Sequence, residues 1–197
     1  LLAAFLGQRR LLYFPARYPL PEGERAAARL GLLPWSAPDG RHLGWRARHP
    51  SGRAAARAVV LHGNAGSALD RGHLRDVLQG PGGPPLDVVL LEYPGYGARG
   101  GAPGQPALVA AAVEAIDLLA AEAPTPVLLV GESLGSAVAA LAAAERPAVG
   151  GLLLVTPLRS VAEVARRHYR WAPAFLVRDR LDAGAALARS AVPAAFV

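Results

Sequence analysis

The segment Pro126-Val-Leu-Leu-Val-Gly-Glu-Ser-Leu-Gly135 is the most informative part of this sequence. An apolar run at residues 127–130 leads into the pattern G-x-S-x-G, which is centred on Ser133. The run has the length and composition of a buried parallel strand. After the serine, apolar residues recur at helical spacing as far as Pro147, which cannot continue a helix. The segment therefore predicts a strand, a sharp turn at Ser133 and a helix.

The two glycines of the pattern are required for steric reasons. A turn that lifts a serine oxygen above the carboxyl edge of a parallel sheet strains the serine backbone and brings the helix close to the strand. Side chains at positions 131 and 135 would collide with their surroundings, so only small residues fit there. The pattern thus predicts a nucleophilic serine at Ser133, the alternative being a Gly-Ser turn without chemistry.

Composition limits the class of protein. A chain of 197 residues with 52% hydrophobic content can bury one sizeable core, and no linker divides it, so we expect a single domain over residues 1–197. The basic residues are all arginines and are scattered, so the net charge of +6 does not predict nucleic-acid binding. The chain contains no cysteine, which excludes disulfides and thiol catalysis.

The beginning of the sequence contains no methionine, so we expect that the start of the protein is missing. The apolar run Leu1-Leu-Ala-Ala-Phe-Leu6 is shorter than a bilayer span, which takes about 20 residues. It is either the remnant of an anchor or signal segment, which would allow membrane association, or a first helix that docks on the domain. Localisation stays open between cytoplasmic and membrane-anchored.

Strand-like and helix-like segments alternate along the chain. We expect strands at residues 57–61, 87–91, 127–130 and 151–155, helices at 67–79 and 106–121, and an early antiparallel strand at 42–48. This alternation implies right-handed crossovers and a three-layer α/β fold with a mostly parallel sheet.

Both predicted helices have apolar stripes. Ser67 and Asp70 form a capping box at the start of the first helix, whose expected buried residues are Leu74, Val77 and Leu78. The expected buried stripe of the second helix is Val109, Val113 and Ile116.

A second motif, His62-Gly-Asn-Ala-Gly66, joins a strand to a helix. A glycine-bearing loop at a helix start presents backbone N–H groups, which suit an anion or a developing oxyanion. Alone, the motif favours a tight strand-to-helix turn in which His62 is a satisfied histidine. Together with the serine turn in the same sheet, it favours a functional loop.

A third motif, Glu92-Tyr-Pro-Gly-Tyr-Gly97, follows the strand at 87–91. Active sites in such sheets lie beyond the carboxyl ends of the strands. We therefore expect Tyr93 and Tyr96 either to line a substrate pocket or to pack within a Pro-Gly turn.

At these residues the chain resembles the alpha/beta-hydrolase superfamily, in its serine-aminopeptidase-like or monoacylglycerol-lipase-like branch. The resemblance also includes Leu11-Leu-Tyr-Phe-Pro15 and the segments at 156–160 and 178–182. It implies that Ser133 is the nucleophile and that the backbone N–H groups of Asn64 and Leu134 form the oxyanion hole. Two positions depart from the family pattern: Arg99 replaces a serine, and Gln105 replaces a glutamate.

The resemblance further implies an acid and a histidine base, each after a later strand. Residues 192–197 look like the start of the strand that delivers the acid, so we expect the sequence to lack the last strand and helix of the fold. His168 is the only histidine after Ser133, and on its arginine-rich, helix-like stretch we expect a surface or packing role. We therefore expect the 197-residue chain alone to be inactive.

The resemblance implies hydrolysis of a carboxylic ester or thioester through an acyl-serine intermediate. Arginine, leucine and aromatic residues in an amphipathic segment at 169–181 favour a small-molecule, lipid-like acyl substrate. No metal or organic cofactor is implied. Two other classes stay open, a peptidase of the same fold and a non-catalytic binding protein of this fold.

Overall fold

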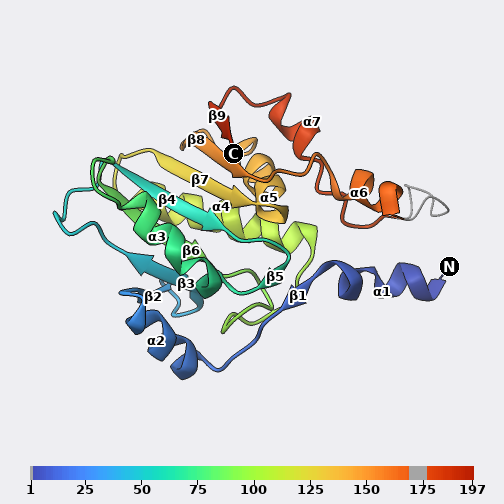
Figure 1. The fold of residues 1–197 in the computed structure, drawn as a ribbon, viewed down its shortest axis with the longest axis horizontal. Coiled ribbons are helices and arrows are strands. Elements are labelled where there is room, and N and C mark those ends of the chain that lie inside the picture. Colours follow the sequence, from blue (N-terminus) through green and yellow to red (C-terminus); the bar gives the residue numbers. More distant parts are fainter. Residues whose placement is uncertain (1, 169–176) are drawn as a thin grey trace.

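A seven-stranded sheet forms the centre of the computed structural model, which describes residues 2–168 and 177–197 (Figure 1). Its strands lie in the order β2 (Leu33–Ser36), β3 (His42–Ala47), β6 (Leu86–Leu91), β4 (Ala56–Leu61), β7 (Val127–Glu132), β8 (Val149–Val155) and β9 (Ala194–Phe196). β3 is antiparallel to both β2 and β6, whereas β6, β4, β7, β8 and β9 are parallel. The predicted α/β fold with its mostly parallel sheet is confirmed.

Helices cover both faces of this sheet (Figure 1). They include α2 (Leu20–Arg29), the 3-10 turn η1 (Ala68–Arg71), α3 (Gly72–Leu78), α4 (Gln105–Glu122) and α5 (Leu134–Ala143). Successive residues of β4 point to opposite faces. Val59 and Leu61 pack in the core beside α4 and α5, and Ala58 and Val60 pack beside α2 and η1. Because both faces are buried, β4 is apolar from Ala58 to Leu61, after Arg57 near its start.

The remaining elements lie near the carboxyl edge of the sheet. α1 (Leu2–Leu12) leads into β1 (Phe14–Pro15), which pairs in parallel with β5 (Ala65–Gly66). α6 (Val161–His168) and α7 (Ala183–Leu187) lie between β8 and β9 in sequence. None of the helices in the described ranges has both the length and the apolar character needed to cross a bilayer.

The segment after Ser67 has the predicted capping box, but one of its three expected buried residues is exposed. The Asp70 carboxylate accepts the Ser67 backbone N–H at 2.7 Å, as the capping box requires. However, Val77 is 71% exposed, while Leu74 and Leu78 pack against the core. The predicted stripe is therefore wrong at Val77.

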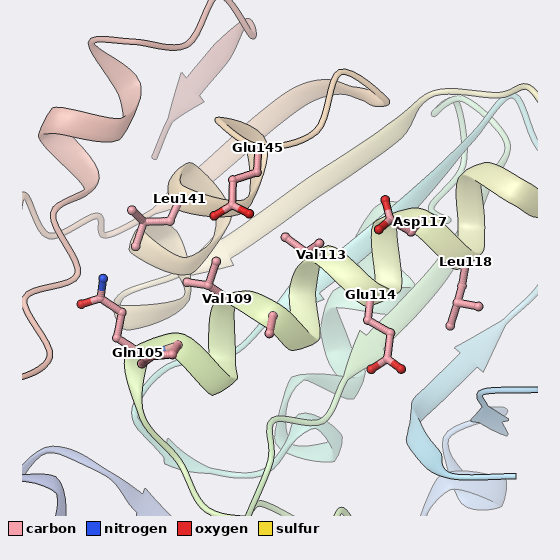
Figure 2. A pocket seen from close by; sticks show the side chains of 10 residues that line it. Gln105, Val109, Val113, Glu114, Asp117, Leu118, Leu141 and Glu145 are labelled. Carbon is pink, nitrogen blue, oxygen red and sulfur yellow. The ribbon is translucent and has the colours of Figure 1, made fainter. Parts of the chain in front are cut away.

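Only one of the three residues predicted to be buried on α4 is fully buried. Ile116 is fully buried, but Val109 and Val113 are only partly buried. With Leu141 of α5 they line an open groove of about 630 Å³ between the two helices (Figure 2). Three of the six buried residues of α4 are alanines, at positions 111, 112 and 115. No residue of the turn at Ser133 lines the groove.

Candidate active site

Ser133 lies in the turn between β7 and α5, with φ 51° and ψ −114°. A positive φ is uncommon outside glycine and costs on the order of 1–3 kcal/mol. The surrounding backbone maintains this conformation. The Ser133 N–H donates to the Val155 carbonyl at 2.9 Å, and the Ser133 carbonyl accepts the Ser136 N–H at 3.0 Å and the Ser136 hydroxyl at 2.5 Å. The predicted strand, sharp turn and helix are thus confirmed.

The flanking glycines allow α5 to pack directly on backbone. A Cβ on Gly131 would lie 2.6 Å from both the Gly135 oxygen and the Ser136 Cα. A Cβ on Gly135 would overlap the Leu61 carbonyl oxygen and lie 2.7 Å from that of His62. Both approaches are closer than carbon atoms tolerate, so the turn requires glycine at both positions.

The loop at Gly63 and Asn64 lies against the serine turn. A Cβ on Gly63 would lie 3.8 Å from the Ser133 Cβ and 3.8 Å from the Glu132 carbonyl oxygen. The backbone N–H of Asn64 and that of Leu134 donate no hydrogen bond to any group in the described part of the chain. The loop therefore brings a second unpaired donor near the serine.

The other polar groups of Asn64 fix the loop to its surroundings. The side-chain Nδ2 donates to the Leu12 carbonyl at 3.0 Å. The Asn64 carbonyl accepts the Phe14 N–H at 2.9 Å and the Tyr96 hydroxyl at 2.7 Å. The N-terminal segment thus supports the loop, a contact that the motif alone did not reveal.

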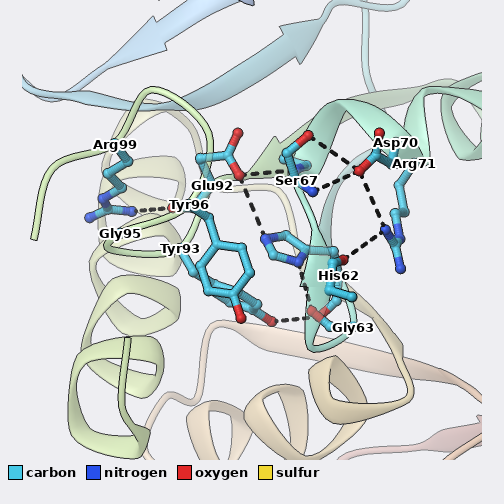
Figure 3. Close-up of polar contacts among 12 residues, drawn as sticks. His62, Gly63, Ser67, Asp70, Arg71, Glu92, Tyr93, Gly95, Tyr96 and Arg99 are labelled. Carbon is cyan, nitrogen blue, oxygen red and sulfur yellow. Dashed lines mark hydrogen bonds and ion pairs between the residues drawn. The ribbon is translucent and has the colours of Figure 1, made fainter. Parts of the chain in front are cut away.

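Tyr93 and Tyr96 lie beside this loop (Figure 3). Both are fully buried. The Tyr93 hydroxyl donates to the His62 carbonyl at 3.2 Å, and the Tyr96 hydroxyl donates to Asn64. These contacts correspond to the packing alternative, and a role in a substrate pocket stays a prediction.

His62 and Glu92 form a fully buried polar pair next to the loop (Figure 3). The His62 Nε2 lies 3.7 Å from the Glu92 Oε1. The Glu92 carboxyl also accepts the Ala68 N–H at 2.9 Å and the Tyr18 hydroxyl at 3.1 Å. Burial raises the pKa of Glu92 to about 7 and lowers the pKa of His62 to about 4. Both side chains are therefore neutral between these pH values.

We expect Glu92→Gln to change the pH dependence of stability. The raised pKa of Glu92 stabilises the fold fully below the ordinary glutamate pKa of 4.5, and this stabilisation is lost as the pH rises through about 7. The lowered pKa of His62 acts in the opposite sense, because its contribution is present above 6.5 and is lost as the pH falls through about 4. In the wild type the two groups therefore change the free energy of unfolding in opposite directions as the pH changes.

The Glu92→Gln variant should retain only the pH dependence of stability that His62 causes. Its free energy of unfolding should fall by about 2–3 kcal/mol between pH 6.5 and 4.5, whereas the wild-type curve stays flatter. Urea unfolding at a series of pH values measures this difference. Glu145→Gln is the control, because Glu145 is exposed and its variant should follow the wild type. Parallel curves for Glu92→Gln and the wild type would show that Glu92 is not held neutral.

An ion pair joins the loop to the serine turn. The Arg71 guanidinium donates to the Glu132 carboxylate through Nε at 2.6 Å and Nη2 at 3.0 Å. This hydrogen bond lowers the pKa of Glu132, so that its carboxylate is charged at neutral pH. The Arg71 Nη2 also lies 3.3 Å from the Cβ position of Gly63.

The Asp179 side chain binds the N-terminal segment. Its carboxylate accepts two hydrogen bonds from Arg9, at 3.0 and 3.2 Å, and one from the Tyr13 hydroxyl at 3.1 Å. Asp182 accepts the Ala185 N–H at the start of α7. The motif at 178–182 thus holds the N-terminal segment and caps a helix.

The two departures from the family pattern have structural partners. The Arg99 guanidinium donates to the Glu92 carbonyl and to the Glu114 carboxylate, both at 2.9 Å. The Gln105 side-chain oxygen accepts the Leu181 N–H at 2.9 Å. Each residue therefore contributes to loop packing around the site.

No base for Ser133 was identified in the described residues. The Ser133 hydroxyl has no hydrogen bond to a histidine there, and the ring of His62 is buried beneath the loop. The side chain of His168 and the segment 169–176 lie outside the described residues, so the predictions for them stay open. Across residues 2–168 and 177–197, no three acidic or histidine side chains are grouped to hold a metal ion.

Sequence comparison defines the family. A profile of the alpha/beta hydrolase family matches residues 58–197, and the chain belongs to this family. Two uncharacterized proteins of Mycobacterium tuberculosis, from strains H37Rv and CDC 1551, are each 38% identical over 170 residues. The match covers 84% of this chain and 59% of each relative, so the chain spans less than two thirds of their length.

Solved structures share the fold. An alpha-beta hydrolase from Vibrio vulnificus has a TM-score of 0.63 at 18% identity, covering 93% of this chain and 78% of its own. An esterase from Pyrococcus furiosus has a TM-score of 0.62 at 17% identity, with 94% and 76% covered. A monoacylglycerol lipase from Paleococcus ferrophilus has a TM-score of 0.51 at 21% identity, with 78% and 76% covered.

Proposed function

We propose that the protein is a serine hydrolase that cleaves a carboxylic ester or thioester, with a lipid-like acyl group favoured. The main support is the position of Ser133, in a strained turn at the end of a central strand with two unpaired backbone N–H groups beside it. This is the arrangement needed to attack a carbonyl carbon and to bind the oxygen that becomes negative. The esterase and the lipase among the similar folds agree with this class.

The proposed reaction has two halves. The Ser133 oxygen attacks the carbonyl carbon while a histidine from outside the described residues takes its proton. The N–H groups of Asn64 and Leu134 stabilise the tetrahedral oxyanion. When it collapses, the alcohol or thiol leaves with the proton, and water then releases the acid from the acyl-serine. No metal or organic cofactor enters this mechanism.

Two experiments separate this proposal from the alternatives. A fluorophosphonate probe should label the full-length protein, whereas a non-catalytic binding protein of the same fold would stay unlabelled. A panel of p-nitrophenyl esters, acyl thioesters and aminoacyl amides then distinguishes an esterase from a peptidase. Preferential turnover of the amides would replace the ester proposal with a peptidase.

We expect substitutions at Asn64 to separate its backbone from its side chain. Asn64→Pro deletes the proposed donor and should lower kcat about 10²- to 10³-fold, the usual cost of one oxyanion donor. Asn64→Ala keeps the N–H and loses only the bond to Leu12, so its effect should be much smaller. Steady-state ester hydrolysis, with melting curves as a check on folding, measures both. Equal and negligible effects would place the donor elsewhere.

A further inference from the structure

The ring of His62 makes a hydrogen bond that identifies its tautomer. Its Nδ1 lies 2.8 Å from the Gly63 carbonyl oxygen. A carbonyl oxygen only accepts hydrogen bonds, so Nδ1 carries the proton. The ring is held in place, since it is fully buried and its centroid lies 4.2 Å from that of Tyr93 and 4.9 Å from that of Tyr96.

The hydrogen bond from His62 is made to the same peptide group that contains the proposed oxyanion donor. The Gly63 carbonyl and the Asn64 N–H belong to one peptide group, and the described chain contains no cis peptide bond. In a trans peptide these two groups point in opposite directions. Holding the carbonyl toward His62 therefore turns the Asn64 N–H away from the buried ring. Gly63 lies beside Ser133, so this orientation matters at the serine.

We propose that His62 is a positioning residue, which as its Nδ1–H tautomer orients the Gly63–Asn64 peptide so that the Asn64 N–H faces the oxyanion formed at Ser133. The inference rests on the proposed function for the identity of the oxyanion. The orientation of the peptide is a separate property, which can be measured whether or not the protein hydrolyses esters.

Glu92 helps to maintain this tautomer. The His62 Nε2 has no hydrogen-bond partner among the described residues, and the Glu92 Oε1 is 3.7 Å from it. A charged carboxylate at this place would attract a proton onto Nε2. A neutral carboxyl does not attract a proton onto Nε2. Hydrogen bonds from Ala68 and Tyr18 hold the Glu92 carboxyl in place. Burial, which keeps Glu92 neutral, thus supports a bare Nε2 and a protonated Nδ1.

Two substitutions test the role of the donor. His62→Phe keeps a ring in the cavity but loses the N–H, whereas His62→Asn places an amide nitrogen near the position of Nδ1. We expect His62→Phe to lower kcat about 10²-fold with little change in KM, because the oxyanion is bound only during the reaction. His62→Asn should recover most of this loss. Affinity for a trifluoromethyl ketone, which mimics the tetrahedral oxyanion, should follow kcat. Equal losses in both variants, or none, would overturn the proposal.

A second measurement does not depend on activity or on a variant that folds. Nitrogen NMR of the wild-type protein labelled at histidine reports which ring nitrogen carries the proton. We expect a protonated Nδ1 and a bare Nε2 at His62 at a pH between the pKa values of His62 and Glu92, where both groups are neutral. A bare Nδ1 at that pH would overturn the proposal even in an active enzyme. If the wild type neither hydrolyses esters nor binds the fluorophosphonate, the proposed function fails. The predicted tautomer would then still support the hydrogen bond from His62 to the Gly63 carbonyl.

Discussion

Ser133→Ala is expected to lower ester hydrolysis by the full-length protein about 10⁴- to 10⁶-fold, the usual loss when a catalytic serine is removed. The variant deletes the attacking oxygen, and residual turnover can come only from the oxyanion donors and substrate binding. Folding should be little affected, because the hydroxyl has no hydrogen bond in the described part of the chain. The backbone bonds that fix the turn all remain.

The measurement combines turnover with probe labelling. A fluorophosphonate should label the wild type at one serine and leave the Ser133→Ala variant unlabelled. Ser51→Ala is the control, since Ser51 is exposed in the loop after β3 and should leave labelling and turnover unchanged. Labelling that persists in the Ser133 variant would assign the nucleophile to another serine.

The turn at Ser133 could be predicted because its determinants are consecutive in sequence. An apolar strand, two small residues around a serine and a helical repeat specify strand, turn and helix without distant contacts. The predicted parallel strands were found for the same reason, since strands buried on both faces contain short apolar runs, at residues 58–61 and 88–91.

The partners of Asp179 could not be predicted. The Arg9 and Tyr13 side chains that bind it are 170 and 166 residues away in sequence, and no periodicity relates positions so far apart. The same limit applies to Tyr93 and Tyr96. Sequence places them after a strand, but tertiary packing decides that their hydroxyls point to the carbonyls of the neighbouring loop.

The turn at Ser133 depends on close backbone packing as much as on the serine. Gly135→Ala is therefore expected to destabilise the fold by at least about 3 kcal/mol, a large part of the usual 5–15 kcal/mol. Helix propensity alone predicts the opposite result, because alanine is favoured over glycine by about 1 kcal/mol within a helix. Here the added Cβ would meet the backbone of Leu61 and His62, which cannot move without distorting β4. Steric overlap should outweigh propensity.

Gly7→Ala provides the matched control, since Gly7 also lies in a helix but no atom of the described residues lies within 4 Å of its Cβ position. That variant should be neutral or slightly stabilised by propensity. Urea unfolding of both variants separates the two effects. A Gly135→Ala protein as stable as the wild type would mean that α5 does not pack on β4 this closely. In that case the turn would lose the constraint that holds Ser133 in its strained conformation, and the support for a nucleophile there would be weaker.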